Sequence, residues 1–325
     1  MWAVLAIGFL IRKITLKQIE VNFLQSNPNK LLLIDGMALL FRSFYATAVS
    51  GQFMVNNKGI PTNAVNGYLK HLLIAISHFN PSHVAVCWDM GSTTFRNEMF
   101  DDYKANRSSA PEELIPQFDI AKEVTDAFHI PNVGVEGYEA DDCIGTISKT
   151  YHHDAQVYIL TGDHDILQLL DENIYVSIMK KGFGNYEFYT HQKFLEEKGF
   201  HPKQFIDVKG LMGDSSDNYP GVRGIGPKTA EKLIKEFGSV HQLLDSLHLL
   251  TPSQRKKIEE DREILLLSRQ LAEIKCDVPI QFNFEESKLS IDVDEVRNRL
   301  HQLDIKGKTS IIHSVEQIHM KITAV

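Results

Sequence analysis

The stretch LLLID, residues 31–35, is a short leucine-rich run that ends in a carboxylate, and the chain repeats this arrangement. HVAVCWD at 83–89 and QVYILTGD at 156–163 have the same form. Helical stretches such as 64–79 and 117–129 lie between these runs, and such alternation is typical of a largely parallel sheet covered by helices. An acid at the carboxyl end of a buried strand points into the crevice where open α/β sheets bind ligands.

The predicted architecture has two domains and two flanking segments. An α/β domain spans residues 30–198, and within it the polar stretch at about 90–117 is too hydrophilic for a core. A small all-helical domain follows at 199–275, where helical segments succeed one another without convincing strands. Residues 276–325 are mixed in character and stay unassigned.

Residues 1–29 form an N-terminal extension before the first strand. It opens with about ten apolar residues before Arg12, which is shorter than the about 20 residues that cross a bilayer. The order of its charged and apolar residues also differs from that of a secretory signal. A short amphipathic helix and an extension from an upstream start codon are equally good explanations, and a membrane tether is the least favoured.

The composition is that of an ordinary globular chain in a reducing compartment. The chain has 325 residues, of which 43% are hydrophobic and 23% are charged. The cysteines Cys87, Cys143 and Cys276 form no CxxC pair, which argues against a disulfide framework or a zinc site and favours the cytoplasm. The net charge of −8 excludes an evenly basic surface. It does not exclude a nucleic-acid partner, because nine clustered acids alone contribute −9.

Nine acidic residues stand directly after strand-like runs or at helix starts. They are Asp35, Asp89, Glu139, Asp141, Asp142, Asp163, Asp165, Asp214 and Asp217. Taken singly, each fits a common structural role, such as a helix cap, a favourable charge at a helix N-terminus or an Asx turn. Together they would repel one another unless divalent cations held them, and oxygen-only ligands suit Mg²⁺ or Mn²⁺. The set predicts a metal-dependent site for phosphoryl transfer.

The polar stretch 90–117 carries basic and aromatic side chains. Lys104 and Arg107 are three residues apart, which places them on one face of a helix, and Arg96 lies two turns earlier. Such groups are natural clamps for a phosphodiester, and Tyr103 offers a ring on which a base can stack. A solvated helix with scattered charges is an equally good interpretation of this stretch alone.

The stretch GVRGIGPKTA, residues 221–230, is a glycine-rich turn that opens a helix at Pro227. Such a turn presents backbone N–H groups and a helix N-terminus to phosphates, which predicts sequence-independent DNA binding, and its carbonyls suit a monovalent cation. The residues expected to contact DNA here are Gly221, Arg223, Gly224, Gly226, Lys228 and Thr229. A plain helix–turn–helix packing element is the alternative.

Five ordered motifs resemble those of the bacterial 5′-3′ exonuclease and flap endonuclease family, which includes the N-terminal nuclease domain of family A DNA polymerases. The motifs are LLLIDGMALLFRSFYA, WDMGSTTFRNEMFDDYKANR, GYEADD, ILTGDHDILQLL and MGDSSDNYPGVRGIGPKTA. The resemblance covers residues 30 to about 275. It implies a PIN-like nuclease domain with a helical arch, followed by a helix-3-turn-helix domain. Since no polymerase domain follows, the chain resembles the stand-alone form.

The resemblance also implies roles for the residues singled out above. Asp35, Asp89, Glu139, Asp141 and Asp142 would form or support one metal site, and Asp163, Asp165, Asp214 and Asp217 would complete a second. Lys104 and Arg107 would bind the scissile phosphate, and Tyr103 would stack near the cleavage point. The turn at 221–226 would grip the duplex, with K⁺ as a further ion. His164 and Tyr219 depart from the family pattern and put only fine substrate tuning in doubt.

The expected activity is divalent-metal-dependent hydrolysis of DNA phosphodiesters from or near a free 5′ end, in flap and primer removal during replication and repair. Two or more Mg²⁺ or Mn²⁺ ions would activate a water and stabilise the leaving oxygen. The expected partners are flaps and nicked or gapped duplexes, with no membrane and no small-molecule cofactor, and the chain is expected to be a monomer. Two alternatives stay open: a PIN-type nuclease that acts on RNA, and a protein that binds branched DNA without cutting it.

Overall fold

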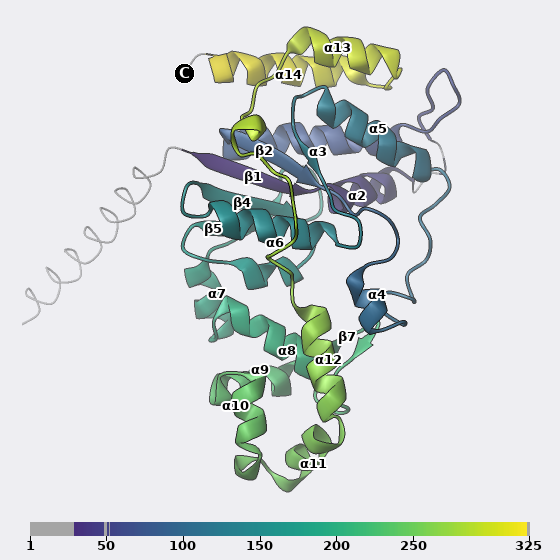
Figure 1. Cartoon of the computed structure of the whole chain (residues 1–325). Helices are drawn as coiled ribbons and strands as arrows, with labels where there is room; N and C mark the ends of the chain where they lie inside the picture. The colour runs from purple at the N-terminus through teal and green to yellow at the C-terminus, as the bar shows by residue number, and fades with distance from the viewer. Residues whose placement is uncertain (1–28, 49–50, 52, 324–325) are drawn as a thin grey trace, which may run out of the picture.

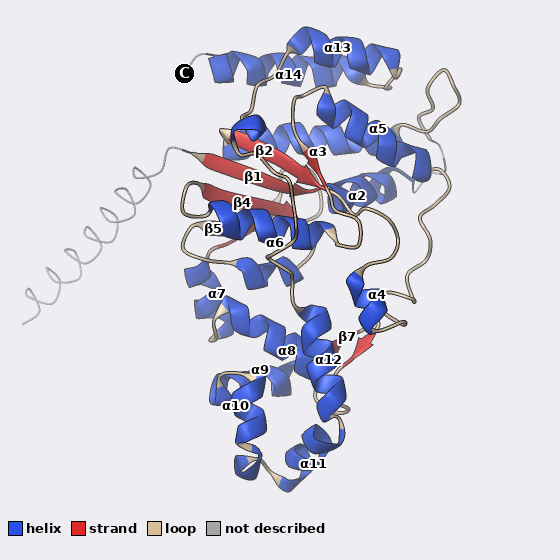
Figure 2. Ribbon diagram, viewed as in Figure 1, coloured by secondary structure: helices blue, strands red, loops and turns tan. Residues whose placement is uncertain are grey.

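A computed structural model describes residues 29–48, 51 and 53–323 of the chain. The predictions for the N-terminal extension therefore lie outside the described residues, apart from Asn29. A central sheet lies between layers of helices, and further helices form one end of the molecule (Figure 1). The strands of the sheet stand together in the middle, and a separate short ribbon lies among the helices of that end (Figure 2).

Six strands form the sheet in the order β3-β2-β1-β4-β5-β6. Their bounds are β1 Lys30–Asp35, β2 His83–Cys87, β3 Asn132–Val133, β4 Gln156–Thr161, β5 Ile174–Met179 and β6 Tyr186–Tyr189. Every pair is parallel except β5 with β6, which confirms the predicted mostly parallel sheet. Because β2 lies on one side of β1 and β4 lies on the other, the ligand crevice is expected outside the carboxyl ends of β1 and β4.

Alternate residues of the central strand face two separate hydrophobic cores. Leu31 and Leu33 point to one core, whereas Leu32 and Ile34 point to the other, and all are fully buried. Over the second core lie α2 Gly36–Ala48, α3 Asn63–Phe79 and α5 Ile115–Asp126, and over the first lie α6 Ala140–Tyr151 and the short helix η1 Asp165–Leu169. Helices therefore cover both faces, as predicted. Full burial of one such leucine contributes about 1.5–3 kcal/mol to stability.

The polar segment after β2 is less helical than predicted. Between β2 and α5 it contains one short helix, α4 Phe95–Met99, and the residues from 100 to 114 form turns and loops. Lys104 adopts a φ of 56°, in the left-handed region, which interrupts a right-handed helix. A turn still brings Lys104 and Arg107 together, since the Arg107 N–H donates to the Lys104 carbonyl at 3.0 Å. The predicted helical arch is thus mostly a loop, and residues 90–114 are called the arch segment below.

The helices at one end of the molecule follow β6. They are α7 His191–Lys198, η2 Pro202–Gln204, α8 Phe205–Met212, α9 Pro227–Phe237, α10 Val240–Asp245, η3 Leu247–Leu249, α11 Pro252–Glu260 and α12 Arg262–Ala272. The helix α9 begins at Pro227, as predicted, and α11 also begins with a proline, a residue that is preorganised for the first position of a helix. Residues 199–275 are called the helical domain below.

A small ribbon in the helical domain corrects the prediction that no strands occur there. It pairs β7 Gly213–Asp214 with β8 Tyr219–Pro220. Glycines let the two backbones approach: a Cβ added to Gly221 would lie 2.3 Å from the Gly213 nitrogen. The ribbon fixes Asp214 directly opposite Tyr219.

The unassigned residues 276–325 return to the α/β domain. They contain η4 Glu285–Ser287, α13 Val293–Gln302 and α14 Lys308–Thr323. Leu300 and Val315 are fully buried in the core that holds α3 and α5, and the Asn66 amide donates to the Lys306 carbonyl at 2.6 Å. The two helices lie across the outer side of α3 and α5 (Figure 1). Among the described helices, none is long and apolar enough to cross a membrane.

Candidate active site

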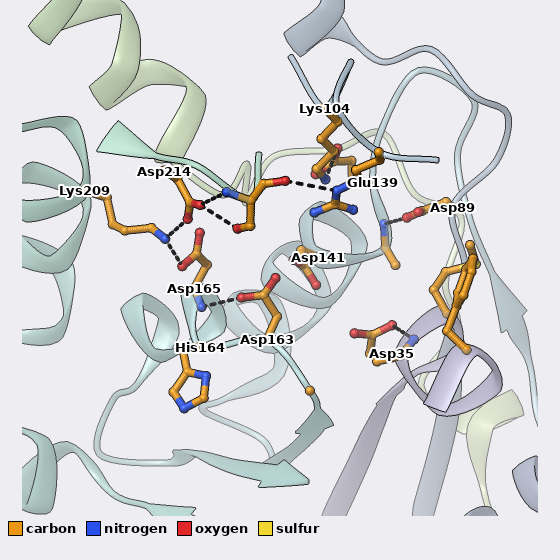
Figure 3. Close-up of a pocket in the computed structure, with 17 residues that line it drawn as sticks. Asp35, Asp89, Lys104, Glu139, Asp141, Asp163, His164, Asp165, Lys209 and Asp214 are labelled. Atoms are coloured by element: carbon orange, nitrogen blue, oxygen red, sulfur yellow. Dashed lines mark hydrogen bonds and ion pairs between the residues drawn. The ribbon is translucent and has the colours of Figure 1, made fainter. Parts of the chain in front are cut away.

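Seven of the nine acids line one cavity of about 480 Å³ at the carboxyl ends of β1 and β4. They are Asp35, Asp89, Glu139, Asp141, Asp163, Asp165 and Asp214. Figure 3 shows their side chains reaching the same space from several elements, with Lys104 and Lys209 at its edge. The crevice expected from the strand order therefore contains most of the acids that the sequence singles out.

Two of these acids continue directly from strands of the sheet. Asp35 ends β1, and its carboxylate accepts the Ala38 N–H at 2.8 Å and the Thr161 hydroxyl at 2.7 Å. Asp89 follows β2 and accepts the Ala140 N–H at 2.7 Å. Each acid therefore also accepts a backbone N–H at the start of a helix, which is the helix-capping role named above as the structural alternative. A carboxylate has lone pairs beyond these bonds, and both acids line the cavity.

Burial and mutual repulsion raise the pKa of Asp35 and of Asp141, which lie on the side of the cavity next to the sheet. Burial, with further repulsion from Asp89 and Asp163, raises the pKa of Asp35 to about 6. Burial, with repulsion from Asp35 and Asp163, raises the pKa of Asp141 well above its usual value. These shifts mean that ionised carboxylates are destabilised here. Bound divalent cations would remove that penalty.

Asp165 and Asp214, which lie on the side of the cavity next to the helical domain, are paired with a lysine. Lys209 of α8 is buried, lies 2.7 Å from Asp165 and also contacts Asp214. Burial and repulsion from Asp163 raise the pKa of Asp165 to about 7 against the opposing effect of Lys209. Burial acts in the same direction on Asp214, but hydrogen bonds led by that of Lys209 leave the pKa of Asp214 below its usual value. The sequence interpretation missed Lys209, whose one signal is a charge inside the apolar run FIDVKGLM at 205–212.

The arch segment places both predicted clamp residues beside the acids. Lys104 Nζ lies 2.6 Å from Glu139 Oε1, and Arg107 Nη2 lies 2.5 Å from Asp217 Oδ1. The Lys104 N–H also donates to the Asp217 carbonyl at 2.8 Å. Asp217 thus contacts the clamp and does not line the cavity. A phosphate would compete with Glu139 and Asp217 for the same two basic groups.

Tyr103 does not offer a ring to a base in this structure. Its side chain is 3% exposed, and its hydroxyl donates to Asp217 at 3.2 Å. The ring packs with Ile206 and Leu271 of the helical domain and lies parallel to Tyr219. The helical domain covers the ring in this structure, so stacking of Tyr103 on a base stays a prediction that requires the ring to become exposed.

Arg96 and Asp142 are buried together outside the cavity. Arg96 is 2% exposed and Asp142 is fully buried, and two hydrogen bonds of 2.8 Å join the guanidinium to the carboxylate. Neither residue lines the cavity. The geometry therefore disagrees with the predictions that Arg96 binds DNA and that Asp142 is a metal ligand. The physical reason is their pairing with each other, which the spacing of the motifs does not reveal.

The glycine turn lies on the helical domain between β8 and α9. Gly224 has a φ of 74°, which favours glycine, and Gly226 is the N-cap residue of α9. Lys228 is exposed in the first turn of that helix, and Thr229 is half-buried beside it. The structure thus presents the predicted combination of a tight turn, a helix N-terminus and a lysine.

Two side chains that the sequence interpretation missed hold this turn. Asp261 is 3% exposed and accepts the Arg223 N–H at 2.8 Å, and it forms an ion pair with the Arg223 guanidinium. Lys257 Nζ donates to the Gly224 carbonyl at 3.2 Å. One of the carbonyls expected to face a monovalent cation therefore accepts an ammonium group here.

The donors on the cavity suit divalent cations. All seven acids are oxygen ligands, which fit Mg²⁺ or Mn²⁺ better than softer metals. Burial, together with repulsion between acids, raises the pKa of Asp35 and of Asp141, and a bound cation would stabilise the ionised form that this environment disfavours. Within residues 29–48, 51 and 53–323, no three His, Cys, Asp or Glu side chains already form a closed set of ligands.

The α/β domain has the PIN-like, resolvase-like fold of a nuclease, with acids at the ligand crevice of its sheet. The family described as 5′-3′ exonuclease, N-terminal resolvase-like domain, matches residues 30–199. The family described as 5′-3′ exonuclease, C-terminal SAM fold, matches residues 200–299. The chain belongs to the 5′-3′ exonuclease family of enzymes, and the resemblance found in its motifs is confirmed.

Two curated relatives show how far the similarity extends. A 5′-3′ exonuclease of Bacillus subtilis is 53% identical over 281 residues, which cover 86% of this chain and 95% of that protein. DNA polymerase I of the same organism is 43% identical over 254 residues, which cover 78% of this chain and 28% of the polymerase. The chain therefore matches less than a third of the polymerase.

Solved structures share the fold at lower identity. The bacteriophage T5 5′-exonuclease with bound divalent metal ions (zinc) has a TM-score of 0.61 at 24% identity, and the match covers 89% of this chain and 98% of that one. The catalytic core of Rad2 in complex with DNA substrate has a TM-score of 0.56 at 16% identity, with 89% and 92% covered. At these identities the likeness establishes the fold alone, and it confirms the predicted fold class.

Proposed function

We propose that this chain hydrolyses DNA phosphodiesters from or near a free 5′ end, as a 5′-3′ exonuclease and 5′-flap endonuclease that depends on divalent cations. The observation that carries the proposal is the cavity that joins seven acids to Lys104 and Arg107. Family membership and the 5′-3′ exonuclease of Bacillus subtilis support the same reaction. The proposed role is flap and primer removal in replication and repair, performed by a monomer in the cytoplasm.

Two or more ions of Mg²⁺ or Mn²⁺ are part of this proposal. Asp35, Asp89, Glu139 and Asp141 would hold ions on the sheet side, and Asp163, Asp165 and Asp214 would hold ions on the helical-domain side, with Asp217 next to them. When bound, such ions neutralise negative charge and lower the pKa of a water molecule. The divalent metal ions (zinc) in the T5 5′-exonuclease structure support a divalent cation as the cofactor.

Lys104 and Arg107 would bind the phosphate that is cleaved. Their charges are now paired with Glu139 and Asp217, and a phosphodiester offers oxygens of the same charge to the same donors. If a phosphate replaced these acids as the partner of Lys104 and Arg107, the DNA backbone would lie at the edge of the acidic cavity. The released carboxylate of Glu139 would then be free to join the other acids.

The helical domain would hold the adjoining duplex through the glycine turn. The N-terminus of α9 and the backbone around Gly224 suit phosphate groups and read no base sequence. Lys228 and Arg223 are exposed at the same turn and add positive charge. We include K⁺ at the turn carbonyls in the proposal. The substrates would be flaps and nicked or gapped duplexes, and the Rad2 complex with DNA supports DNA as the partner.

A duplex with a labelled 5′ flap tests this function directly. Release of the flap near its junction is expected with Mg²⁺, and no release is expected with EDTA. A second substrate with a blocked 5′ end is expected to be cut more slowly, because the reaction needs a free end. Tight binding without cleavage in Mg²⁺ or Mn²⁺ would contradict the proposal, and faster cleavage of a matched RNA flap would assign the activity to RNA.

A further inference from the structure

Three segments that are far apart in the sequence meet at Arg96 of α4. Its guanidinium donates two hydrogen bonds to Asp142 of α6, both at 2.8 Å. It also donates to the Leu271 carbonyl at 3.0 Å and to the Glu273 carbonyl at 2.8 Å, where α12 ends. One buried side chain therefore joins the arch segment, the first turn of α6 and the end of the helical domain.

Every acceptor position of Asp142 is used inside the protein. Its Oδ2 accepts Arg96 Nη1 and the Glu139 N–H, and its Oδ1 accepts Arg96 Nη2 and the Lys275 N–H. A carboxylate has about four acceptor positions, so this set fills them. The side chain is also fully buried. Asp142 therefore anchors neighbouring segments of the chain, while Asp141 beside it lines the cavity.

A second side chain ties the same part of the helical domain to the other acids. Gln168 of η1 accepts the Ile274 N–H and donates to the Ala272 carbonyl, both at 3.0 Å. The helix η1 begins at Asp165, which lines the cavity. Residues 271–275, called the exit segment below, therefore contact both α6 and η1. These two elements carry Asp141 and Asp165, which line the cavity.

The chemistry of the Arg96–Asp142 pair favours a positioning role over a simple gain in stability. Buried ion pairs add little net stability compared with apolar residues of the same volume, because both charges lose their hydration. A guanidinium fixes direction through its planar fork of donors, which an ammonium group does not. Arg96 uses this fork to meet one carboxylate and two carbonyls at once.

We propose that Arg96 and Asp142 are positioning residues that align the acids of α6 with the duplex held by the helical domain. This inference rests on the proposed function. When the helical domain binds a duplex, the exit segment is held in one position. The contact between Arg96 and Asp142 then holds the first turn of α6 in a fixed position relative to that segment. The same pair holds α4, so it also sets the base of the arch segment that carries Lys104.

Single-turnover cleavage of a 5′-flap substrate at increasing Mg²⁺ separates an anchor from a metal ligand. Arg96→Lys and Asp142→Asn are each expected to lower the maximal rate about 10- to 100-fold, the range found for groups that orient metal ligands. The Mg²⁺ concentration that gives half of the maximal rate is expected to stay unchanged. The double variant is expected to lose no more than the larger single loss, because both residues act through one contact.

Two reference variants calibrate this experiment. Asp141→Asn alters a proposed ligand and is expected to raise the Mg²⁺ requirement. Arg299→Lys alters an arginine that pairs with Glu123 between α13 and α5, outside the cavity, and its cleavage rate is expected to equal that of the unchanged protein. Duplex affinity and thermal melting are measured for every variant, so that loss of folding is recognised.

A second measurement needs no variant. A blunt duplex added to the unchanged protein in EDTA is expected to slow amide hydrogen exchange at residues 139–145, because the exit segment passes its placement to α6. No slowing there would overturn the proposal, as would a full cleavage rate in Arg96→Lys or a raised Mg²⁺ requirement in Asp142→Asn. Absence of cleavage by the unchanged protein would instead refute the proposed function, so the two failures are distinguishable.

Discussion

The two sides of the acidic cavity balance their charge in different ways. On the sheet side, the residues that the structure describes form no ion pair between a lysine or arginine and Asp35, Asp89 or Asp141. On the helical-domain side, Lys209 contacts both Asp165 and Asp214. Asp35, Asp89 and Asp141 therefore have no lysine or arginine partner in the described structure, whereas Lys104 is paired with Glu139 at the edge of the cavity and Lys209 is paired with Asp165 and Asp214.

The largest effect is expected from Asp141→Asn on the sheet side. A bound ion stabilises a phosphoryl-transfer transition state by several kcal/mol, and about 1.4 kcal/mol changes a rate tenfold, so we expect a loss of about 1000-fold. The flap assay in Mg²⁺ measures the loss, and Asp154→Asn, at an exposed acid, is the control. Because the raised pKa of Asp141 marks a destabilised carboxylate, the variant should also melt at a higher temperature in EDTA. A lower melting temperature would point to a structural role.

The next largest effect is expected from Lys209→Met on the helical-domain side. Removal of one partner from a buried ion pair costs about 3–5 kcal/mol, because the acids that remain lose their partner. Urea unfolding in EDTA measures this loss, and Lys232→Met, at an exposed lysine of α9, is the control. Mg²⁺ should restore more stability to Lys209→Met than it adds to the unchanged protein, because an ion can replace the ammonium group. Equal gains in the two proteins would remove the contrast between the two sides.

Stability should also depend on pH in opposite senses at Asp35 and at Asp214, whereas Asp165, whose pKa is raised, acts in the same sense as Asp35. The pKa of Asp35 is about 6 in the folded chain and 3.8 in an unperturbed carboxyl, so its contribution to stability falls as pH rises between these values. A shift of this size corresponds to about 3 kcal/mol. Asp214 has a lowered pKa, so its contribution is present above the usual pKa and is lost as pH falls through the lowered one.

Urea unfolding between pH 4 and pH 8 in EDTA measures this difference. Asp35→Asn should reduce the decline between about pH 4 and pH 6, because one titrating group is gone, and the decline that remains comes from Asp141 and Asp165, whose pKa is also raised. Saturating Mg²⁺ should also reduce the decline of stability with rising pH in the unchanged protein. An unaltered slope in Asp35→Asn would show that another group causes the decline.

The smallest effect is expected from Tyr219→Phe, on the ribbon that carries Asp214. In the described structure the Tyr219 hydroxyl is buried without a hydrogen-bond partner. Its removal should raise the free energy of unfolding by about 1 kcal/mol, because an unpaired buried donor is costly. Tyr189→Phe is the matched control and should not gain, since the Tyr189 hydroxyl donates to Glu187 at 2.9 Å. A loss of stability in Tyr219→Phe would reveal a bound partner for the hydroxyl.

Local signals explain which parts of the molecule the sequence predicts well. The helix α9 lies between a proline at its first position and Gly238 beyond its end, so its bounds can be deduced. Asp35 ends one strand and Asp89 follows its parallel neighbour, and strand ends of this kind meet at one edge of a sheet. These features need no knowledge of distant partners.

Distant partners explain what the sequence does not predict. Arg96 comes from a polar segment that reads as surface, yet it is buried because Asp142 and the carbonyls at the end of α12 receive its donors. Lys209 lies in an apolar helix and is stabilised by acids that arrive from other elements. The helices of residues 276–325 acquire a core only when they reach α3 and α5. The spacing of residues within one segment does not predict such contacts.

The helical domain is an insertion within the α/β fold, because α13 and α14 pack on α3 and α5 after the chain has passed through it. The chain enters near Pro202 and leaves near Lys275, and both residues line one cavity, so the two tethers are adjacent. One hydrophobic core holds Leu31 and Leu33 of β1 together with Val208 and Leu211 of α8, so the inserted domain packs directly on the sheet domain. Asp35 and Asp214 therefore reach the same cavity from two domains whose relative position that shared core fixes.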